Sequence, residues 1–285
     1  MSILNETYTL SNSVSIPKLG LGTWFIDDDA APAAVRSAIE LGYRNIDTAQ
    51  AYGNERGVGE GLRSSAVPRE ELFVSTKLTA EIKDYDQAVA AIDESLEKLG
   101  LDYIDLMLIH APQPWDQFRG DDFSEGNLAA WKALEEAYLA GKLRAIGVSN
   151  FLEADLQNII DNAEVAPQVN QILVHAGNTP TELINFCQQK NIIVQAYSPI
   201  GHGEILGNDK IIEIASRYEV SVPQLCIKYT IQLGTVSLPK TANPEHMKSN
   251  AALDFEISES DMQILQNLHE RDYGDSSMFP VYSGK

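Results

Sequence analysis

Four residues in the first 110 positions have side chains that could exchange protons with a bound molecule. Asp47 ends the apolar stretch RNID, Lys77 ends LFVSTK and His110 ends IDLMLIH. Tyr52 follows Asp47 in the polar stretch TAQAYGNE. An acid, a base, a histidine and a phenol would meet in one place if these apolar runs were neighbouring strands of a single sheet.

The four side chains suit proton transfer to an oxygen atom. A free phenol has a pKa of about 10, too high for ready proton exchange near neutral pH. A nearby ammonium favours the phenolate, so we expect Lys77 to lower the pKa of Tyr52. Asp47 would keep Lys77 charged, and a neutral His110 would orient a substrate oxygen. The set could protonate a carbonyl oxygen but supplies no hydride, so it needs a nicotinamide cofactor.

Each of these residues also has a purely structural explanation. Asp47 could accept hydrogen bonds from loop amides, and Lys77 could reach the surface along an apolar stem. His110 could be a hydrogen-bonded core histidine. Tyr52 could be a half-exposed loop aromatic. The position of all four at or just beyond strand ends favours the catalytic interpretation.

The apolar runs that carry these residues alternate with helical patterns along the chain. Eight runs predict strands at 19–23, 44–47, 72–77, 104–110, 145–150, 168–171, 192–198 and 235–240. Segments between them, such as 85–100 and 124–142, repeat apolar residues three and four positions apart, as amphipathic helices do. Eight strand–helix units in 285 residues predict an α/β fold, a (β/α)₈ TIM barrel that forms one domain over residues 1–285.

Two additions to a minimal barrel are expected. The alternating stretch YTLSNSVSIP predicts an N-terminal β-hairpin that turns at Ser11 and Asn12. Helical patterns at 209–233 and 258–270 predict extra helices near the C-terminus. The active site of such a barrel lies at the C-terminal ends of its strands, which is where the polar residues above are placed.

Composition excludes several classes of function. The formal net charge of −20 argues against a nucleic-acid partner, because phosphate binding needs a basic face. No apolar stretch approaches the length of a membrane span, and the N-terminus shows no signal-peptide pattern, so we expect a cytoplasmic protein without membrane contact. Cys187 and Cys226 lack metal-ligand spacing and are expected to be reduced core thiols, so no metal site is predicted.

Together these motifs resemble the aldo-keto reductase family, with similarity to prokaryotic 2,5-diketo-gluconate reductases. The resemblance rests on LGLGTW, NIDTAQAYGNERGVGEGL, STK, IDLMLIH, GKLRAIGVSNF, APQVNQI, AYSPI and LPKTANPEHMKSN, in family order over nearly the whole chain. It implies that Asp47, Tyr52, Lys77 and His110 form a catalytic tetrad with Tyr52 as general acid. It also implies NADPH-dependent reduction of aldehydes and ketones to alcohols by a monomer.

The resemblance also implies positions for the cofactor. Ser149, Asn150 and Gln171 would contact the nicotinamide carboxamide, and Tyr197 would stack on the ring. The remaining implied contacts run from the first strand end, through the pyrophosphate, to the adenosine 2′-phosphate and adenine, and are Thr23, Ser198, Pro199, Ile200, Gly201, Lys240, Thr241, His246 and Asn250. The stretches GLGTW and GVGEG match no dinucleotide fingerprint, and we expect them to serve a tight turn and close helix packing.

Departures from the family pattern bear on specificity. His246 stands where many relatives have an arginine, so we expect NADPH to be favoured and NADH to be used more weakly. Ala111 and Thr79 stand where many relatives have aromatic residues. We therefore expect a widened substrate pocket, walled by Trp24 and Trp115, that accepts bulky ketones and ketoesters.

Two other functions stay open at this point. Some members of the superfamily resemble the cytoplasmic β-subunits of potassium channels and act as cofactor-binding regulatory modules, although the complete tetrad argues against that role. A barrel aldolase could use Lys77 to form a Schiff base. An acidic neighbour such as Asp47 would keep the lysine charged and poorly nucleophilic, which disfavours this reading.

Overall fold

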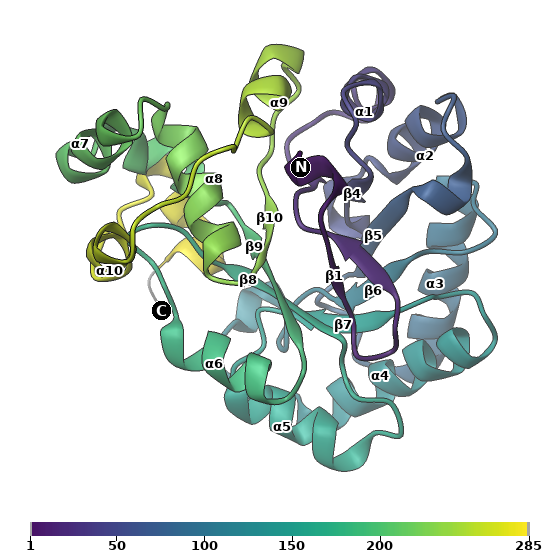
Figure 1. The fold of residues 1–285 in the computed structure, drawn as a ribbon. Helices are drawn as coiled ribbons and strands as arrows, with labels where there is room; N and C mark the ends of the chain where they lie inside the picture. The colour runs from purple at the N-terminus through teal and green to yellow at the C-terminus, as the bar shows by residue number, and fades with distance from the viewer. Residues whose placement is uncertain (1, 284–285) are drawn as a thin grey trace.

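The centre of the protein is a ring of parallel strands, seen in a computed structural model that describes residues 2–283 (Figure 1). The strands pair in the order β10-β9-β8-β7-β6-β5-β4-β3. Their bounds are β3 (Leu21–Gly22), β4 (Asn45–Asp47), β5 (Phe73–Leu78), β6 (Leu106–Ile109), β7 (Ile146–Ser149), β8 (Val169–Leu173), β9 (Ile193–Tyr197) and β10 (Val236–Leu238). Each predicted strand is present, so the α/β barrel prediction is confirmed.

The first and last strands meet and close the barrel. Parallel bridges join Leu19 to Ser237 and Gly22 to Lys240. The amide of Gly22 donates to the carbonyl of Pro239 at 3.0 Å. Closure brings the ends of all eight strands to one rim, so residues that are far apart in sequence can share a single site.

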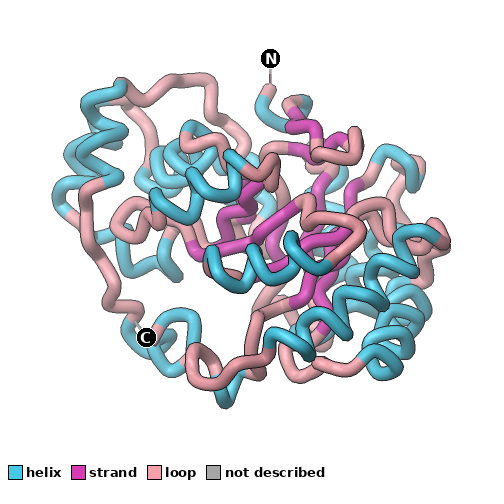
Figure 2. Tube along the Cα trace, turned by 90° about the horizontal axis from the view of Figure 1, so that it is seen from below, coloured by secondary structure: helices cyan, strands magenta, loops and turns pink. Residues whose placement is uncertain are grey.

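Helices follow the strands and surround the sheet, as Figure 2 shows in cyan around the magenta strands. They are α1 (Ala31–Glu40), α2 (Glu55–Arg63), α3 (Tyr85–Leu99), α4 (Ser124–Leu139), α5 (Glu153–Asn162), α6 (Thr181–Gln189), α7 (Asp209–Arg217), α8 (Val222–Gln232), α9 (Pro244–Asn250) and α10 (Glu259–Gln266). Local signals fix their ends. In α3, Asp84 caps the first turn by accepting the Gln87 amide at 3.1 Å, and Gly100 ends the helix at φ 62°.

The predicted additions to the barrel are both present. β1 (Thr7–Thr9) and β2 (Ser15–Pro17) form the antiparallel hairpin, which lies across the strands in Figure 1. Its loop includes Ser13 at φ 69°, one residue beyond the predicted turn, as in three-residue hairpin loops. Ile16 packs with barrel-lining residues such as Leu106 and Val236, so the hairpin covers one end of the barrel. The extra helices are α7 and α10, which Figure 1 shows on one side of the barrel beside α8.

Close packing accounts for the glycine-rich stretch GVGEG. It lies in α2, where a Cβ atom on Gly57 would come 2.0 Å from the Asp28 carbonyl oxygen. A Cβ atom on Gly59 would come 2.1 Å from the Leu99 carbonyl oxygen. The predicted role in helix packing is confirmed. GLGTW runs along β3 and ends in a tight turn, in which the Ile26 amide donates to the Thr23 carbonyl at 3.0 Å.

Two further predictions concern the core and the surface. Cys187 on α6 and Cys226 on α8 are buried and free, as predicted for core thiols. Over residues 2–283 we find no helix with the length and apolar character that a membrane span needs.

Candidate active site

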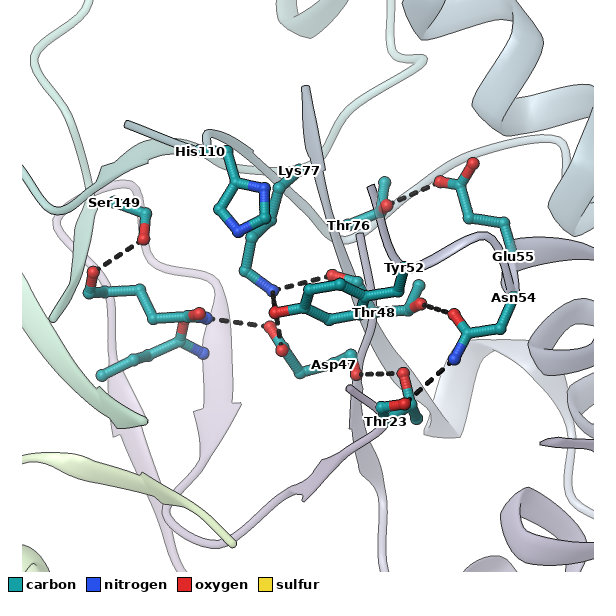
Figure 3. Close-up of polar contacts among 12 residues, drawn as sticks. Thr23, Asp47, Thr48, Tyr52, Asn54, Glu55, Thr76, Lys77, His110 and Ser149 are labelled. Atoms are coloured by element: carbon teal, nitrogen blue, oxygen red, sulfur yellow. Dashed lines mark hydrogen bonds and ion pairs between the residues drawn. The ribbon is translucent and has the colours of Figure 1, made fainter. Parts of the chain in front are cut away.

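Three of the four predicted catalytic side chains touch at the C-terminal ends of β4 and β5 (Figure 3). Lys77 is fully buried, and its Nζ donates to Asp47 Oδ2 at 2.8 Å and to the Tyr52 hydroxyl at 3.3 Å. The third N–H of the ammonium donates to the Thr48 carbonyl at 2.8 Å. Asp47 also accepts from Gln171 Nε2 through Oδ1 at 2.8 Å. Every donor of Lys77 and both oxygens of Asp47 are therefore engaged.

Strand register explains why Asp47 and Lys77 face each other. In the parallel pair of β4 and β5, Asp47 lies opposite Ser75. Lys77 is two residues beyond Ser75, and side chains two apart on a strand share one face. Both side chains therefore point toward the barrel axis, with Lys77 nearer the C-terminal rim.

The loop after β4 carries Tyr52 back over this pair. Tyr52 ends the short 3₁₀ helix η2 (Gln50–Tyr52), and Gly53 reverses the chain at φ 68°, a conformation that glycine adopts readily. Asn54 then ties the loop down. It donates to the carbonyl of Thr23 at 3.0 Å and accepts the Thr48 hydroxyl at 2.6 Å. Asn54 is fully buried and was missed by the sequence reasoning, although it lies within the same motif.

His110 follows β6 and faces Tyr52. The two rings are 5.8 Å apart at 72°, and Trp115 packs edge-on to His110 at 5.1 Å. Burial, together with the charges of Lys77 and Lys83, holds the pKa of His110 well below its ordinary value of 6.5. The imidazole is therefore neutral near neutral pH, as the sequence reasoning expected. Its Nδ1 atom is buried without a hydrogen-bond partner.

The pKa of Tyr52 shifts in the direction opposite to the one expected. Burial raises the pKa of Tyr52 well above 10.0, and the negative charge of Asp47 raises it further. The neighbouring Lys77 ammonium does not reverse the direction of this shift. Burial also lowers the pKa of Lys77, while Asp47 acts the other way. The phenol stays protonated at neutral pH and can give up its proton only to a strong base.

A cavity of about 520 Å³ opens beside these residues. Trp24 and Trp115 line it, together with Asp47, Tyr52 and His110. Of the residues assigned to the cofactor, the lining includes Thr23, Ser149, Asn150, Gln171, Tyr197, Ser198, Pro199, Ile200 and Lys240. Residues from β3 through β10 therefore meet in one hollow at the C-terminal rim.

Some predicted site residues lie outside this lining. Ala111 is fully buried, and its carbonyl accepts the Nζ of Lys83 at 2.8 Å. Neither Ala111 nor Thr79 is part of the cavity wall, and Thr79 is only partly buried, so the widening of the pocket by these two small residues stays a prediction. Gly201, Thr241, His246 and Asn250 also lie outside the wall.

The groups expected to hold a carboxamide bond to one another. Asn150, at φ 61°, donates from Nδ2 to the His110 carbonyl at 3.0 Å and accepts the Tyr197 hydroxyl at 2.7 Å. The Ser149 hydroxyl donates to the Gln171 carbonyl at 2.8 Å. These bonds link the histidine-bearing end of β6 to the ends of β7, β8 and β9.

The other end of the cavity wall carries a positive charge on an exposed side chain. Lys240 is exposed at the end of β10, and α9 begins at Pro244 as expected. The first amide of α9 is already occupied, because Asn243 Oδ1 accepts the Glu245 amide at 2.9 Å. The Thr241 hydroxyl accepts the Asn243 amide at 3.1 Å. His246 is exposed on α9.

Nine residues of the cavity wall were missed by the sequence reasoning, and three of them, Gly22, Ala51 and Leu238, lie in β3, η2 and β10. Two others come from loops after β3 and β9, namely Phe25 and His202, and four come from the C-terminal tail, namely Phe279, Pro280, Val281 and Tyr282. Phe25 stacks on Trp24 with ring centres 4.3 Å apart, and Phe279 meets Trp24 at 5.1 Å. The only signal in the sequence is the apolar run FPVY at the end of an otherwise polar tail.

Comparison with known proteins gives a consistent picture. Residues 18–270 match the Aldo/keto reductase family. The chain is 44 % identical over 267 residues to the 9,11-endoperoxide prostaglandin H2 reductase of Trypanosoma cruzi, covering 92 % of this chain and 91 % of that protein. It is 39 % identical over 269 residues to the glyoxal reductase of Bacillus subtilis, covering 94 % of each.

A solved structure is similar over the same extent. The crystal structure of an aldo-keto reductase from Bombyx mori in complex with NADP superimposes with a TM-score of 0.86 at 35 % sequence identity. The match covers 97 % of this chain and 98 % of that one.

Proposed function

The chain belongs to the aldo/keto reductase family, and on that premise we propose that it reduces aldehydes and ketones to alcohols with NADPH, taking the proton from Tyr52. Family membership makes it an oxidoreductase that uses a nicotinamide cofactor. The observation that carries the finer proposal is the contact of Lys77 with both Asp47 and the Tyr52 hydroxyl.

The proposed chemistry divides between Tyr52 and His110. Neutral His110 orients the carbonyl oxygen by hydrogen bonding, within reach of the Tyr52 ring that it faces. Tyr52 then gives its proton to the oxygen as it becomes an alkoxide, which is a much stronger base than a phenolate. The Lys77 ammonium stabilises the phenolate that remains, and Asp47 holds Lys77 in place.

The cavity wall carries groups suited to binding a nicotinamide dinucleotide. Its wall offers the side-chain amides of Asn150 and Gln171, the ring of Tyr197, and the cation of Lys240 at the other end. A local cation in a chain of net charge −20 suits a phosphate-bearing ligand. The bound cofactor would supply the hydride that no side chain can supply.

We assign NADPH as the preferred form and NADH as a weaker alternative. Lys240 places a positive charge beside the proposed adenosine end, where a 2′-phosphate would lie. His246 lacks the forked donors that an arginine would offer there, so we expect the discrimination between the two cofactors to be modest.

The proposed substrates are small-molecule carbonyl compounds that bind between aromatic walls. Trp24, Trp115, Phe25 and Phe279 line the cavity around the reacting groups, so bulky ketones and ketoesters should be accepted. We further propose that the protein works as a cytoplasmic monomer with residues 1–285 as one domain.

An aldolase mechanism through Lys77 is not supported. The Nζ atom has three acceptors at hydrogen-bond distance and the side chain is fully buried, so a carbonyl carbon could not reach it without breaking the Asp47 pair. A purely regulatory role would leave the protein without turnover, which the experiment below distinguishes.

The test is cofactor oxidation with a panel of aldehydes, ketones and ketoesters, using wild type and Tyr52→Phe. We expect wild-type turnover with NADPH and a loss in the variant of about 10²–10⁴-fold in kcat, typical of removing a general acid. The dissociation constant of NADPH should change little, because the phenyl ring remains. Wild-type turnover by Tyr52→Phe, or no turnover by wild type on any substrate, would reject the proposal.

A further inference from the structure

The C-terminal tail enters the cavity proposed for the cofactor. We call residues 274–282 the strap; it consists of the 3₁₀ helices η6 (Gly274–Met278) and η7 (Pro280–Tyr282), joined by Phe279. The residue just before the strap, Tyr273, is held by a hydrogen bond between its hydroxyl and His175 Nε2 at 2.9 Å. The far half of the strap, from Phe279 to Tyr282, forms part of the cavity wall.

Tyr282 makes the deepest contacts of the strap. Its side chain is 1 % exposed, and its hydroxyl lies 2.7 Å from the Ser198 hydroxyl. Its ring is perpendicular to that of Tyr197 at 6.4 Å and packs on His202 at 4.5 Å. Tyr282 thus contacts the residue proposed to stack on the nicotinamide and the first residue proposed for the pyrophosphate.

The strap packs against one polar atom of the cavity that has no hydrogen-bond partner. His202 lies between Trp24 and Tyr282, and its Nε2 atom is buried without a hydrogen-bond partner. Ser198 and His202 both hold left-handed backbone conformations, with φ of 50° and 56°, which side-chain-bearing residues rarely adopt. An unpaired buried nitrogen disfavours the closed strap and would be relieved if a hydrogen-bonding ligand replaced Tyr282.

We propose that the strap is an internal occupant of the cofactor site, which must withdraw Tyr282 from Ser198 before a nicotinamide dinucleotide can bind. This inference rests on the proposed function. The closed strap and the bound cofactor compete for the same hydroxyl and the same aromatic surface. Competition of this kind raises the apparent dissociation constant of the cofactor by the inverse of the fraction of molecules whose strap is open.

The direct test is Tyr282→Phe, which removes the hydroxyl and keeps the ring. Losing one hydrogen bond of the closed state should tighten NADPH binding by roughly two- to tenfold, measured by fluorescence titration. The matched control is Tyr229→Phe. The Tyr229 hydroxyl lies 2.7 Å from the Thr179 hydroxyl, an equivalent bond away from the cavity wall, and its loss should leave NADPH binding unchanged.

Hydrogen exchange of the wild-type strap gives a second readout. The amides of Phe279 and Tyr282 are hydrogen-bonded within the strap, to the carbonyls of Ser276 and Phe279. Saturation with NADPH should speed exchange at these amides, because the strap is released. Slower exchange, or weaker NADPH binding by Tyr282→Phe, would mean that the strap closes over the cofactor, and would overturn the proposal.

The binding measurements distinguish a failure of the strap proposal from a failure of the proposed function. If wild type and Tyr282→Phe bind NADPH with equal affinity, the strap does not compete and only this inference fails. If neither protein binds NADPH or NADH at all, the proposed function is refuted and the competition with it.

Discussion

Replacing Asp47 by asparagine should damage both stability and turnover, and the structure sets the size of the effect. The carboxylate and the Lys77 ammonium are 2.8 Å apart with side chains 5 % and 0 % exposed. At an effective dielectric constant of about 20, their attraction is about 6 kcal/mol. Removing one partner of such a buried pair typically costs about 3–5 kcal/mol, because the other charge is left uncompensated.

The hydrogen-bond geometry adds to this loss. Oδ2 of Asp47 accepts from Lys77, and Oδ1 accepts from Gln171 Nε2. An asparagine has one acceptor oxygen, so its own NH₂ group must face one of these two donors. We therefore expect the free energy of unfolding of Asp47→Asn to fall by about 3–5 kcal/mol. We expect kcat to fall about 10²-fold, since Lys77 would no longer be held against Tyr52.

The assay combines urea unfolding with steady-state kinetics at a temperature where the variants are folded. Asp105→Asn is the matched control, because Asp105 is fully buried and bound to Arg69 and Arg144 just before β6, at the opposite end of that strand from the site. It should lose stability yet keep kcat within about twofold. Wild-type stability and kcat in Asp47→Asn would refute the reasoning.

Two further predictions concern charge. His246→Arg should lower the dissociation constant of NADPH about tenfold and leave that of NADH almost unchanged, because it adds a guanidinium group beside the proposed 2′-phosphate site. Equal effects in titrations of both cofactors would refute that site. Burial lowers the pKa of Lys83 from 10.5 to about 7. The folded protein therefore binds the Lys83 proton less tightly than the unfolded chain does. The free energy of unfolding of wild type should then rise with pH between about pH 7 and pH 10.5. Lys83→Met should therefore be more stable than wild type at neutral pH, and its advantage should shrink by about 1.4 kcal/mol per pH unit up to about pH 10. A pH-independent difference in urea unfolding would contradict this.

The barrel and the tetrad could be predicted because their signals are periodic or local. Each strand ends in a polar residue, and parallel pairing must bring those ends to one rim. The short run QVNQ was predicted as residues 168–171 and is β8, Val169–Leu173, although its polar composition resembles a loop. Its polar side chains are accommodated inside the barrel, where Gln171 bonds to Asp47.

The errors arise where packing, which sequence does not encode locally, decides the outcome. The pKa of Tyr52 depends on burial by side chains from distant loops, so the neighbouring lysine alone gave the wrong direction. Ala111 follows His110 directly but is covered by packing, so adjacency in sequence did not place it in the wall. The strap could not be predicted, since its 3₁₀ turns have no extended apolar period and its contacts are not local: Tyr282 and Ser198 are 84 positions apart.

The hydrogen bond between Asp47 and Gln171 has a consequence for how the protein is made. It joins residues 124 positions apart, and the bridges that close the barrel join β3 to β10 across an even longer separation. Contacts of such long range form late in folding, because the entropy of closing a large loop must be overcome first. A nascent chain that has emerged only as far as His110, just after β6, carries all four tetrad residues but lacks the glutamine that orients Asp47. We therefore expect catalytic competence to arise in the last folding step, together with barrel closure, and not with the appearance of helical structure.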